Sequence, residues 1–289
     1  MTPLVLCRFA HILAVMMAFG ASAYLWLYAP DALRRSLSPA VGSLVAFFSV
    51  VALVTAVLWL MLEAASMADD WSAASDPGAI VAVATDTSFG RAWVVRLVLA
   101  ATLVAIATPP RAPWAAIGGL SALVLASLAL VGHAAMQTGV EGALHHCNDA
   151  VHVLAAGAWL GGLIPFLMCL RRFTDDRLGP EALEAMMRFS FFGHFVVAAI
   201  VATGILNIAL TSGHAPWPPS TPYRTLLDAK IVAVATMISL ALYNRYRLAP
   251  RLKQRADALA ALRLTSAIEV ALGTVVVALV SVFAMLDPA

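Results

Sequence analysis

Residues 141–172 combine metal-ligand side chains with an apolar run long enough to cross a bilayer. If this stretch is helical, His145, Asp149 and His152 follow one another at positions i, i+4 and i+7 and share one face. Trp159 continues the same face about 20 Å beyond His145 at 1.5 Å per residue. Imidazole is a ligand that suits copper and zinc. The spacing therefore predicts a metal site at the polar end of a membrane helix.

Four further histidines complete the set of candidate ligands. His133 ends one apolar segment and His146 begins the next, so a short hairpin would bring both to the same mouth. His11 and His194 lie inside other apolar segments and are predicted to form further metal-binding sites deeper in the membrane. Asp149 either binds the metal ion or orients an imidazole that does. The complete predicted metal set is His133, His145, His146, Asp149, His152, His11 and His194.

Common catalytic motifs are absent from the sequence. It contains no P-loop, no GxSxG, no HExxH, and no pair of carboxylates beside an evident nucleophile. We therefore predict that the protein is not an enzyme, and the lack of a P-loop argues against an ATP-driven pump. The net charge of +2 is too small to indicate a nucleic-acid partner.

The composition is that of an integral membrane protein. Of 289 residues, 62% are hydrophobic and 12% are charged, with a mean hydropathy of +0.89, whereas soluble domains are roughly half apolar and about a quarter charged. Apolar segments near ~20 residues cross the bilayer as helices. We predict an all-α, polytopic membrane bundle that forms a single domain over residues 1–289. About eight transmembrane helices are expected near residues 4–29, 40–65, 91–108, 113–137, 148–170, 188–212, 227–248 and 264–286.

Three glycines predict close packing of the helix at 148–170. Gly157, Gly161 and Gly162 give it a face of small residues, which lets another membrane helix approach closely. No strand precedes them, so we prefer this interpretation to a nucleotide-binding loop.

The distribution of Lys and Arg predicts the orientation of the helices. The loops after the first, third, fifth and seventh segments, with their helix ends, hold thirteen of the 18 basic residues, and the other side holds five. Because basic residues concentrate on the cytoplasmic side, both termini are predicted outside. The outer side then carries the loop at 66–90 with its aspartates, the hairpin at 138–147 and the loop at 214–222. This acidic, histidine-bearing surface suits a cation that arrives from outside.

Several short motifs occur in an order and spacing that are similar to one known family. His145-x-x-x-Asp149-x-x-His152 precedes Trp159-x-Gly161-Gly162, Arg188-Phe189-Ser190, Thr203-Gly204-Ile205-Leu206-Asn207, Thr221-Pro222-Tyr223, Leu226-Leu227, Lys230, Asn244-Arg245 and Pro250, with Phe89-Gly90-Arg91-Ala92-Trp93 and Arg96 upstream. Over about residues 85–255 the chain resembles CopD, the bacterial inner-membrane copper resistance and copper homeostasis protein D family. It departs from that family at Arg224, where a glycine is common, and at Asp228, where an apolar residue is usual.

The resemblance implies an eight-helix copper protein of the bacterial inner membrane. With the charge distribution, it places both termini in the periplasm. It also implies a periplasmic copper-binding partner of the CopC type, which a separate protein would supply. The expected ligands and surroundings are therefore a copper ion, this partner and the lipid bilayer.

Three functions fit these residues. In the first, copper binds at the periplasmic mouth and passes toward the cytoplasm along a histidine-lined path. In the second, facing histidines among His11, His133, His152 and His194 hold haem in a membrane redox protein, which an absorption spectrum would reveal. In the third, the same mouth holds copper in a sensor or scaffold that does not transport it. Histidines crowded at one surface favour copper over haem, and measurement of copper flux separates transport from binding.

Overall fold

The computed structural model describes residues 2–107, 113–131, 139–212, 221–252, 256–283 and 285–286. These residues form helices and connecting turns, with no β-strand among them, as the sequence predicts. The α-helices are α1 (Thr2–Leu27), α2 (Asp31–Ala68), α3 (Pro77–Asp86), α4 (Ser88–Ala107), α5 (Trp114–Ala126), α6 (Gly139–Arg172), α7 (Gly179–Ser212), α8 (Pro222–Tyr243) and α9 (Ala256–Phe283). Short 3₁₀ segments lie at Trp71–Ala74 (η1), Ser127–Leu130 (η2) and Ala249–Arg251 (η5), and a π turn (η4) lies at Asn244–Leu248.

Seven of the helices in the described ranges are long and apolar enough to cross a membrane. The eighth predicted span, at 113–137, is shorter than expected, because α5 and η2 together cover only Trp114–Leu130 in the described chain. At 1.5 Å per residue its 13-residue α-helix is about 20 Å long. It nevertheless packs inside the bundle against α1, α4 and α6. The all-α polytopic membrane fold is therefore confirmed.

Most helices begin earlier than the hydrophobic runs predict. α6 begins at Gly139 instead of 148, so the predicted hairpin at 138–147 is wrong, and His145 and His146 lie within a helix. The prediction also missed the short α3 inside the loop at 66–90. Hydropathy marks only the part of a helix that lies in hydrocarbon, whereas backbone hydrogen bonding continues into the polar boundary.

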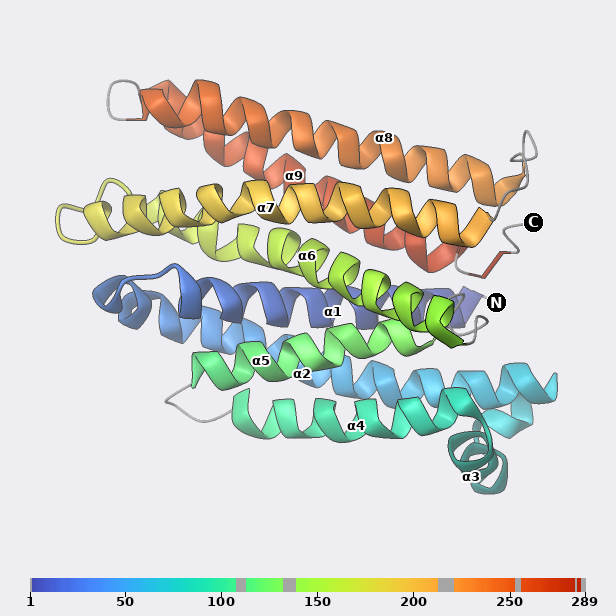
Figure 1. Ribbon diagram of the computed structural model, residues 1–289. Coiled ribbons are helices and arrows are strands. Elements are labelled where there is room, and N and C mark those ends of the chain that lie inside the picture. Colours follow the sequence, from blue (N-terminus) through green and yellow to red (C-terminus); the bar gives the residue numbers. More distant parts are fainter. Residues whose placement is uncertain are drawn as a thin grey trace.

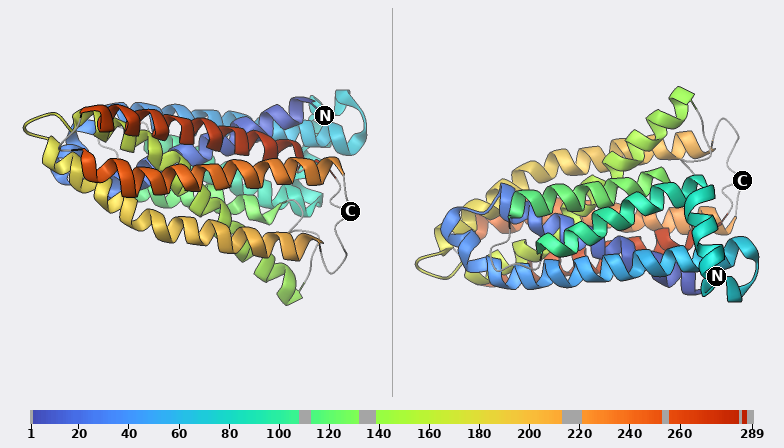
Figure 2. Two further views of the ribbon diagram at one scale, coloured as in Figure 1. Left: turned by 90° about the horizontal axis from the view of Figure 1, so that it is seen from above. Right: turned by 90° about the horizontal axis from the view of Figure 1, so that it is seen from below.

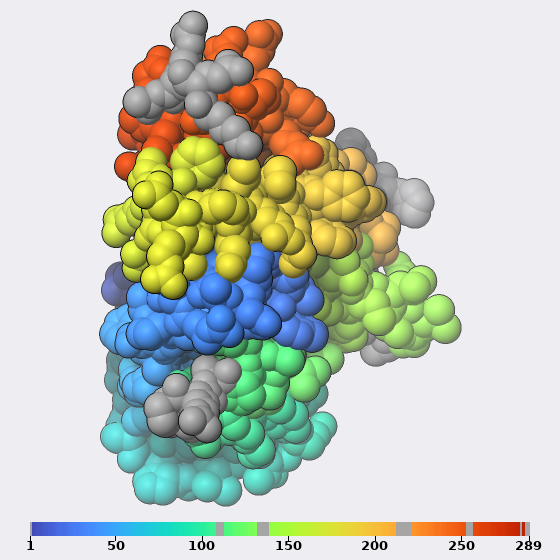
Figure 3. Space-filling model, turned by 90° about the vertical axis from the view of Figure 1, so that its left-hand side faces the viewer, coloured from blue at the N-terminus to red at the C-terminus, as the bar shows by residue number. Residues whose placement is uncertain are grey.

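The long helices run up and down, and the two termini lie at the same end of the bundle (Figure 1). The links α1 to α2, α6 to α7 and α8 to α9 lie at the opposite end, where the Arg-rich segments of the sequence gather. Which end faces the cytoplasm stays a prediction from the positive-inside pattern. Seen from the end of these links (Figure 3), the helices stack in the order α8/α9, α6/α7, α1/α2 and α4/α5.

Helix α1 occupies the centre of this stack. It packs against α2, α5, α6 and α9 and buries a nearly continuous side of small and aliphatic residues that includes Val15, Ala18, Ala21 and Leu25. Because α1 contacts α2 and α5 as well as α6 and α9, it holds α6 in place relative to α2 and α5.

The contact between α1 and α6 is a backbone contact made possible by glycine. A Cβ on Gly161 would lie 2.2 Å from the carbonyl oxygen of Met16, and one on Gly20 would lie 2.3 Å from that of Gly157. A Cβ on Gly162 would meet the ring of Phe189 on α7 at 2.6 Å. The predicted small-residue face of α6 is therefore confirmed, and it fixes this helix between α1 and α7.

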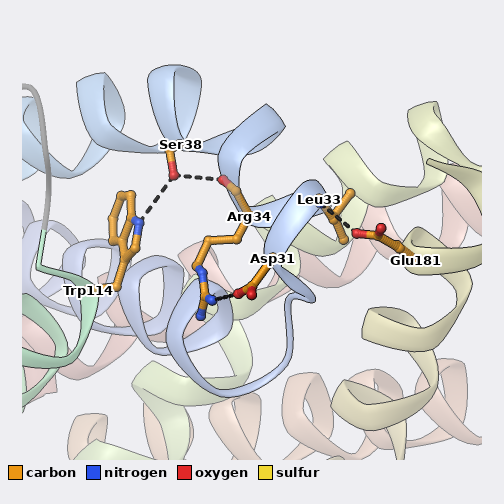
Figure 4. A network of polar contacts seen from close by, with 6 residues as sticks. All are labelled: Asp31, Leu33, Arg34, Ser38, Trp114 and Glu181. Atoms are coloured by element: carbon orange, nitrogen blue, oxygen red, sulfur yellow. Dashed lines mark hydrogen bonds and ion pairs between the residues drawn. The ribbon is translucent and has the colours of Figure 1, made fainter. Parts of the chain in front are cut away.

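Polar contacts tie three helices together at the end opposite the termini (Figure 4). The Leu33 amide at the start of α2 donates to Glu181 Oε2 on α7 at 2.7 Å. The indole N–H of Trp114 on α5 donates to Ser38 Oγ at 3.2 Å, and Arg34 pairs with Asp31. These contacts anchor α7 and α5 on the first turns of α2.

Candidate metal site

A polar network joins α6 to α7 inside an otherwise apolar bundle. On α6, Asn148 Nδ2 donates to Thr203 O at 3.0 Å and to Asn207 Oδ1 at 2.6 Å. Asn207 Nδ2 in turn donates to Asp149 Oδ1 at 3.0 Å. His152 lies one turn further along α6, with Nδ1 2.9 Å from Thr203 Oγ1. We call these five residues, Asn148, Asp149, His152, Thr203 and Asn207, the outer network.

The hydrogen bonds fix which nitrogen of His152 is available. The Thr203 hydroxyl donates to Ala199 O at 2.5 Å, so its oxygen accepts from His152 Nδ1–H at 2.9 Å. Nε2 then carries the lone pair, which is the form of imidazole that binds metal ions. In metal sites the ligating imidazole almost always donates its other ring N–H to an acceptor, a role that the Thr203 oxygen would fill here.

Lys230 on α8 adds a positive charge beside the outer network. It is half-buried and interacts electrostatically with both Asp149 and His152. Its ammonium group also lies 5.6 Å from the ring centroid of Phe283. Asp149 and Lys230 form no ion pair in the described part of the chain, but their formal charges are opposite and sum to zero.

Two further predicted ligands lie near the start of α6, whose first turns project from the bundle (Figure 2). His145 is buried, with 4% of its surface exposed, one turn before Asp149. His146 points elsewhere: its Nδ1–H donates to Ala129 O of η2 at 2.7 Å, which leaves Nε2 as an acceptor. His133 lies outside the described residues.

His11 belongs to a different part of the fold. It is fully buried among α1, α2 and α4, with Nδ1 3.0 Å from Ala52 O and its ring against Trp59 and Trp93. The guanidinium of Arg96 stacks 4.0 Å from the Trp93 ring centroid in the same cluster. His11 therefore lies apart from the α6 to α7 contact.

His194 lies on the exposed side of α7. Its Nδ1–H donates to Phe191 O at 3.2 Å, and Nε2 accepts from the hydroxyl of Tyr246 at 3.1 Å. Both ring nitrogens are engaged, so a metal ion would have to displace Tyr246. His11, His152 and His194 share no hydrogen-bond partner: His11 bonds α2, His152 bonds Thr203, and His194 bonds Phe191 and Tyr246.

Among the described residues, no three side chains of His, Cys, Asp or Glu are gathered closely enough to hold a metal ion. The structure brings Asp149 and His152 to one contact with α7, and His145 precedes them on the same helix. It does not bring His11, His146 or His194 to that contact. A metal ion at the outer network would thus have few protein ligands.

Comparisons with known proteins identify the family. Two family models match: "Copper resistance protein D-like, N-terminal domain" over residues 1–143 and "Copper resistance protein D" over residues 183–283. Inner membrane protein YebZ of Escherichia coli is 36% identical over 286 residues, which cover 97% of each chain. Copper resistance protein D of Pseudomonas syringae pv. tomato is 30% identical over 304 residues, covering 97% of this chain and 95% of that protein. The chain belongs to the copper resistance protein D family. No solved structure matches it.

The motifs that resemble the copper resistance protein D family converge in space. Asp149, His152, Thr203 and Asn207 form the outer network, and Lys230 lies beside it. These residues come from three helices that are far apart in the sequence. Their order along the chain predicted the family, but not that they meet.

Sequence reasoning missed Glu269, the carboxylate on α9. Only 2% of its surface is exposed, and it accepts hydrogen bonds from Trp159 Nε1–H at 3.3 Å and Asn244 Nδ2–H at 2.7 Å. The signal was present, because Glu269 is a lone acidic residue in the middle of an apolar helix, and such residues are costly and typically functional.

Proposed function

We propose that this protein carries copper across the bacterial inner membrane, from the periplasm toward the cytoplasm, along the region between α6, α7 and α8. A relative in Pseudomonas syringae is named for copper resistance, and one in Escherichia coli is named an inner membrane protein. The outer network is the observation that carries the proposal. It places a carboxylate and a metal-competent imidazole within a membrane bundle, on the half that carries the termini.

Polar groups in this position are expensive unless they serve a purpose. Asp or Lys at the centre of a membrane helix costs about 2.5–3.5 kcal/mol on insertion scales. Two such residues, Asp149 of α6 and Lys230 of α8, lie beside the imidazole of His152 in this part of the bundle. In membrane proteins such groups typically mark an ion pathway.

Lys230 would help a copper ion to leave the outer network after it has bound there. A cation that binds Asp149 must compete with the ammonium group of Lys230, so binding is weaker than to an isolated carboxylate. Conduction needs sites that bind strongly enough to capture the ion and weakly enough to release it. A nearly neutral site with few protein ligands meets that requirement better than a closed cage of four.

His145 and His146 extend the proposed path outward along α6, together with His133. The projecting first turns of α6 would be the point at which a separate periplasmic copper-binding protein of the CopC type delivers its ion. Residues Val140 and Leu144 are exposed there at 79% and 61%, which offers an apolar surface for such a partner.

Copper accumulation in cells tests the proposal. In bacteria that express the protein, we expect His152→Ala and Asp149→Asn each to reduce copper-dependent cytoplasmic accumulation at least about tenfold, because metal sites lose 10–100-fold when a supporting group is removed. Elemental analysis of the cytoplasmic fraction measures the effect, with membrane levels checked by immunoblot.

Asp228→Asn is the matched control. Asp228 is an exposed carboxylate on α8 that pairs with Arg224, and it lies outside the outer network. We expect this variant to accumulate copper as the wild type does. If His152→Ala and Asp149→Asn also behave as wild type at equal expression, copper does not pass through the outer network.

A further inference from the structure

A cavity of about 510 Å³ lies between α6, α7, α8 and α9. α7 packs along α6 and α8 along α9, but α7 and α8 have almost no backbone contact with each other, which leaves the space open between them. Most of its wall is apolar, with Trp159, Leu163 and Phe166 of α6 on one side. The polar lining includes Asn244 and the cation Arg245, and Glu269 and Ser266 of α9 are the most deeply buried polar side chains in it.

Glu269 is held in place by neutral donors. Trp159 and Asn244 each donate one hydrogen bond to a different carboxylate oxygen, and Thr265 Oγ1–H orients Asn244 by donating to its Oδ1 at 2.6 Å. Asn244 also begins the π turn η4, a helix distortion that is frequent at functional sites. Each carboxylate oxygen keeps a lone pair that none of these bonds uses.

No basic side chain in the described ranges forms an ion pair with Glu269. Ser266, one turn earlier on α9, is 1% exposed and lines the same cavity, yet its hydroxyl has no hydrogen-bond partner there. A buried hydroxyl without a partner costs free energy, as does a buried carboxylate without a cation. The carboxylate of Glu269 and the hydroxyl of Ser266 are therefore oxygen atoms that a bound cation could use as ligands.

The cavity also carries soft metal ligands. Met186 and Met187 line it from α7, and thioether groups favour copper(I) over the hard cations. His194 also lines the cavity, but its Nε2 accepts from Tyr246. The two methionines and the carboxylate come from different helices, so the wall offers sulfur and oxygen donors to one cavity.

The cavity lies further along the same helix face as the outer network. Trp159, which bonds Glu269, follows His152 by seven residues, or about 10 Å on α6. Between the two lies an apolar cluster that includes Ala155, Ile200 and Met237. An ion path with an outer and an inner binding site is expected to have this arrangement, in which an apolar layer separates two polar sites.

We propose that Glu269 and Ser266 form an inner cation site that takes the copper ion after it leaves the outer network, with Met186 available as a soft ligand. The proposal rests on the proposed function, since it assumes that copper moves through this region. It adds a second station, at a carboxylate that no motif of the sequence indicates.

Copper(I) binding to the purified full-length protein tests the inner site. Copper per chain is measured by equilibrium dialysis against a chromophoric copper(I) chelator. We expect two ions for the wild type, one for Glu269→Gln, one for His152→Ala and none for the double variant. Gln is nearly isosteric with Glu, but its one carbonyl oxygen can replace only one of the two acceptors that Trp159 and Asn244 use. The thermal unfolding temperature of this variant is therefore measured together with its copper content.

Two further variants separate a metal site from a structural role. Ser266→Ala removes a hydroxyl that has no hydrogen-bond partner among the described residues, so it should not lower the thermal stability, but it should weaken the inner site several-fold. Glu184→Gln changes an exposed carboxylate on α7 that pairs with Arg188, and it should still bind two ions.

The outcomes distinguish the two proposals. If Glu269→Gln still binds two ions, or if Ser266→Ala binds as the wild type does, the inner site is wrong, whatever the outer network does. If only Glu269→Gln loses an ion and His152→Ala keeps both, the inner site stands and the outer network fails. A wild type that binds no copper contradicts both.

Discussion

At the scale of single residues, the hydrogen bonds of His152 leave Nε2 as the nitrogen that could bind a metal ion in the proposed site. Thr203 makes this assignment, because its hydroxyl proton is already donated to Ala199 O. The same geometry leaves Nε2 of His146 as an acceptor, whereas the Nε2 of His194 accepts from Tyr246. Histidines that are equivalent in the sequence therefore differ in whether their Nε2 already accepts a hydrogen bond in the fold.

Thr203→Val tests this assignment. The variant keeps the shape of the side chain but leaves His152 Nδ1–H without its acceptor, so the imidazole is free to rotate and change tautomer. We expect copper(I) affinity at the outer network to fall about tenfold, within the range for groups that support a metal ligand. Competition with a chromophoric chelator measures it.

Thr236→Val is the control for that prediction. Thr236 is an exposed residue of α8 whose hydroxyl bonds only Val232 O, one turn earlier. It should bind copper as the wild type does. Equal affinity in Thr203→Val and the wild type would show that Thr203 does not orient the ligand.

The sequence predicted part of this site. The spacing of His145, Asp149 and His152 placed them on one face of a helix, since helical periodicity alone determines that. Periodicity says nothing about which helix lies opposite, so the contribution of Thr203 and Asn207 to the network could not be derived. Glu269 was visible as an acidic residue in the middle of an apolar helix, but its partners, Trp159 and Asn244, could not be derived because they lie 110 and 25 residues away in the chain.

At the scale of helices, the position of α6 depends on its glycines. Gly161→Ala would place a methyl group 2.2 Å from Met16 O, so α1 and α6 must move apart. Overpacking of this kind costs about 1–3 kcal/mol. We expect a lower thermal unfolding temperature in detergent, together with weaker copper binding at the outer network, because α6 carries its ligands.

Gly119→Ala is the matched control on α5. Nothing lies within 4 Å of a Cβ at this position, so the added methyl group meets open space. Ala also favours the helix over Gly by about 1 kcal/mol. This variant should unfold at the wild-type temperature or slightly above it. A Gly161→Ala protein as stable as the wild type would mean that the close backbone contact does not hold α6.

Hydropathy predicted where the helices cross the membrane but not how far they extend beyond it. The runs at 148–170 and 188–212 were located correctly, yet α6 and α7 each begin nine residues earlier, at Gly139 and Gly179. The first turns contain charged residues such as Glu141 and Glu181, which lower hydropathy while they stabilise a helix N-terminus. A scale that measures lipid preference cannot detect a helix outside the lipid.

At the scale of the molecule, the candidate path lies in one half of the stack. α6 to α9 carry the outer network and the cavity, whereas α1 to α5 carry the buried cluster of His11, Trp93 and Arg96. The first matching family model ends at residue 143 and the second begins at residue 183, so most of α6 lies between the two. α1 joins the halves through its glycine contact, and a single membrane domain over the whole chain remains our prediction.

If both proposed sites bind copper, their arrangement fits transport better than a sensor or scaffold. A protein that only holds copper at its surface needs the outer network but has no use for a buried carboxylate beyond an apolar layer. A carrier needs both, together with a barrier that keeps water and protons from passing freely. The apolar cluster around Met237 is suited to that role.

Copper influx into proteoliposomes is the measurement that tests this account most directly. Vesicles of determined orientation, loaded with a membrane-impermeant fluorescent copper(I) chelator, would be given copper(I) from the side that carries the termini. We predict influx well above that of protein-free vesicles, and its loss in the His152→Ala/Glu269→Gln double variant. Copper that binds to the wild-type protein without any influx above protein-free vesicles would contradict transport.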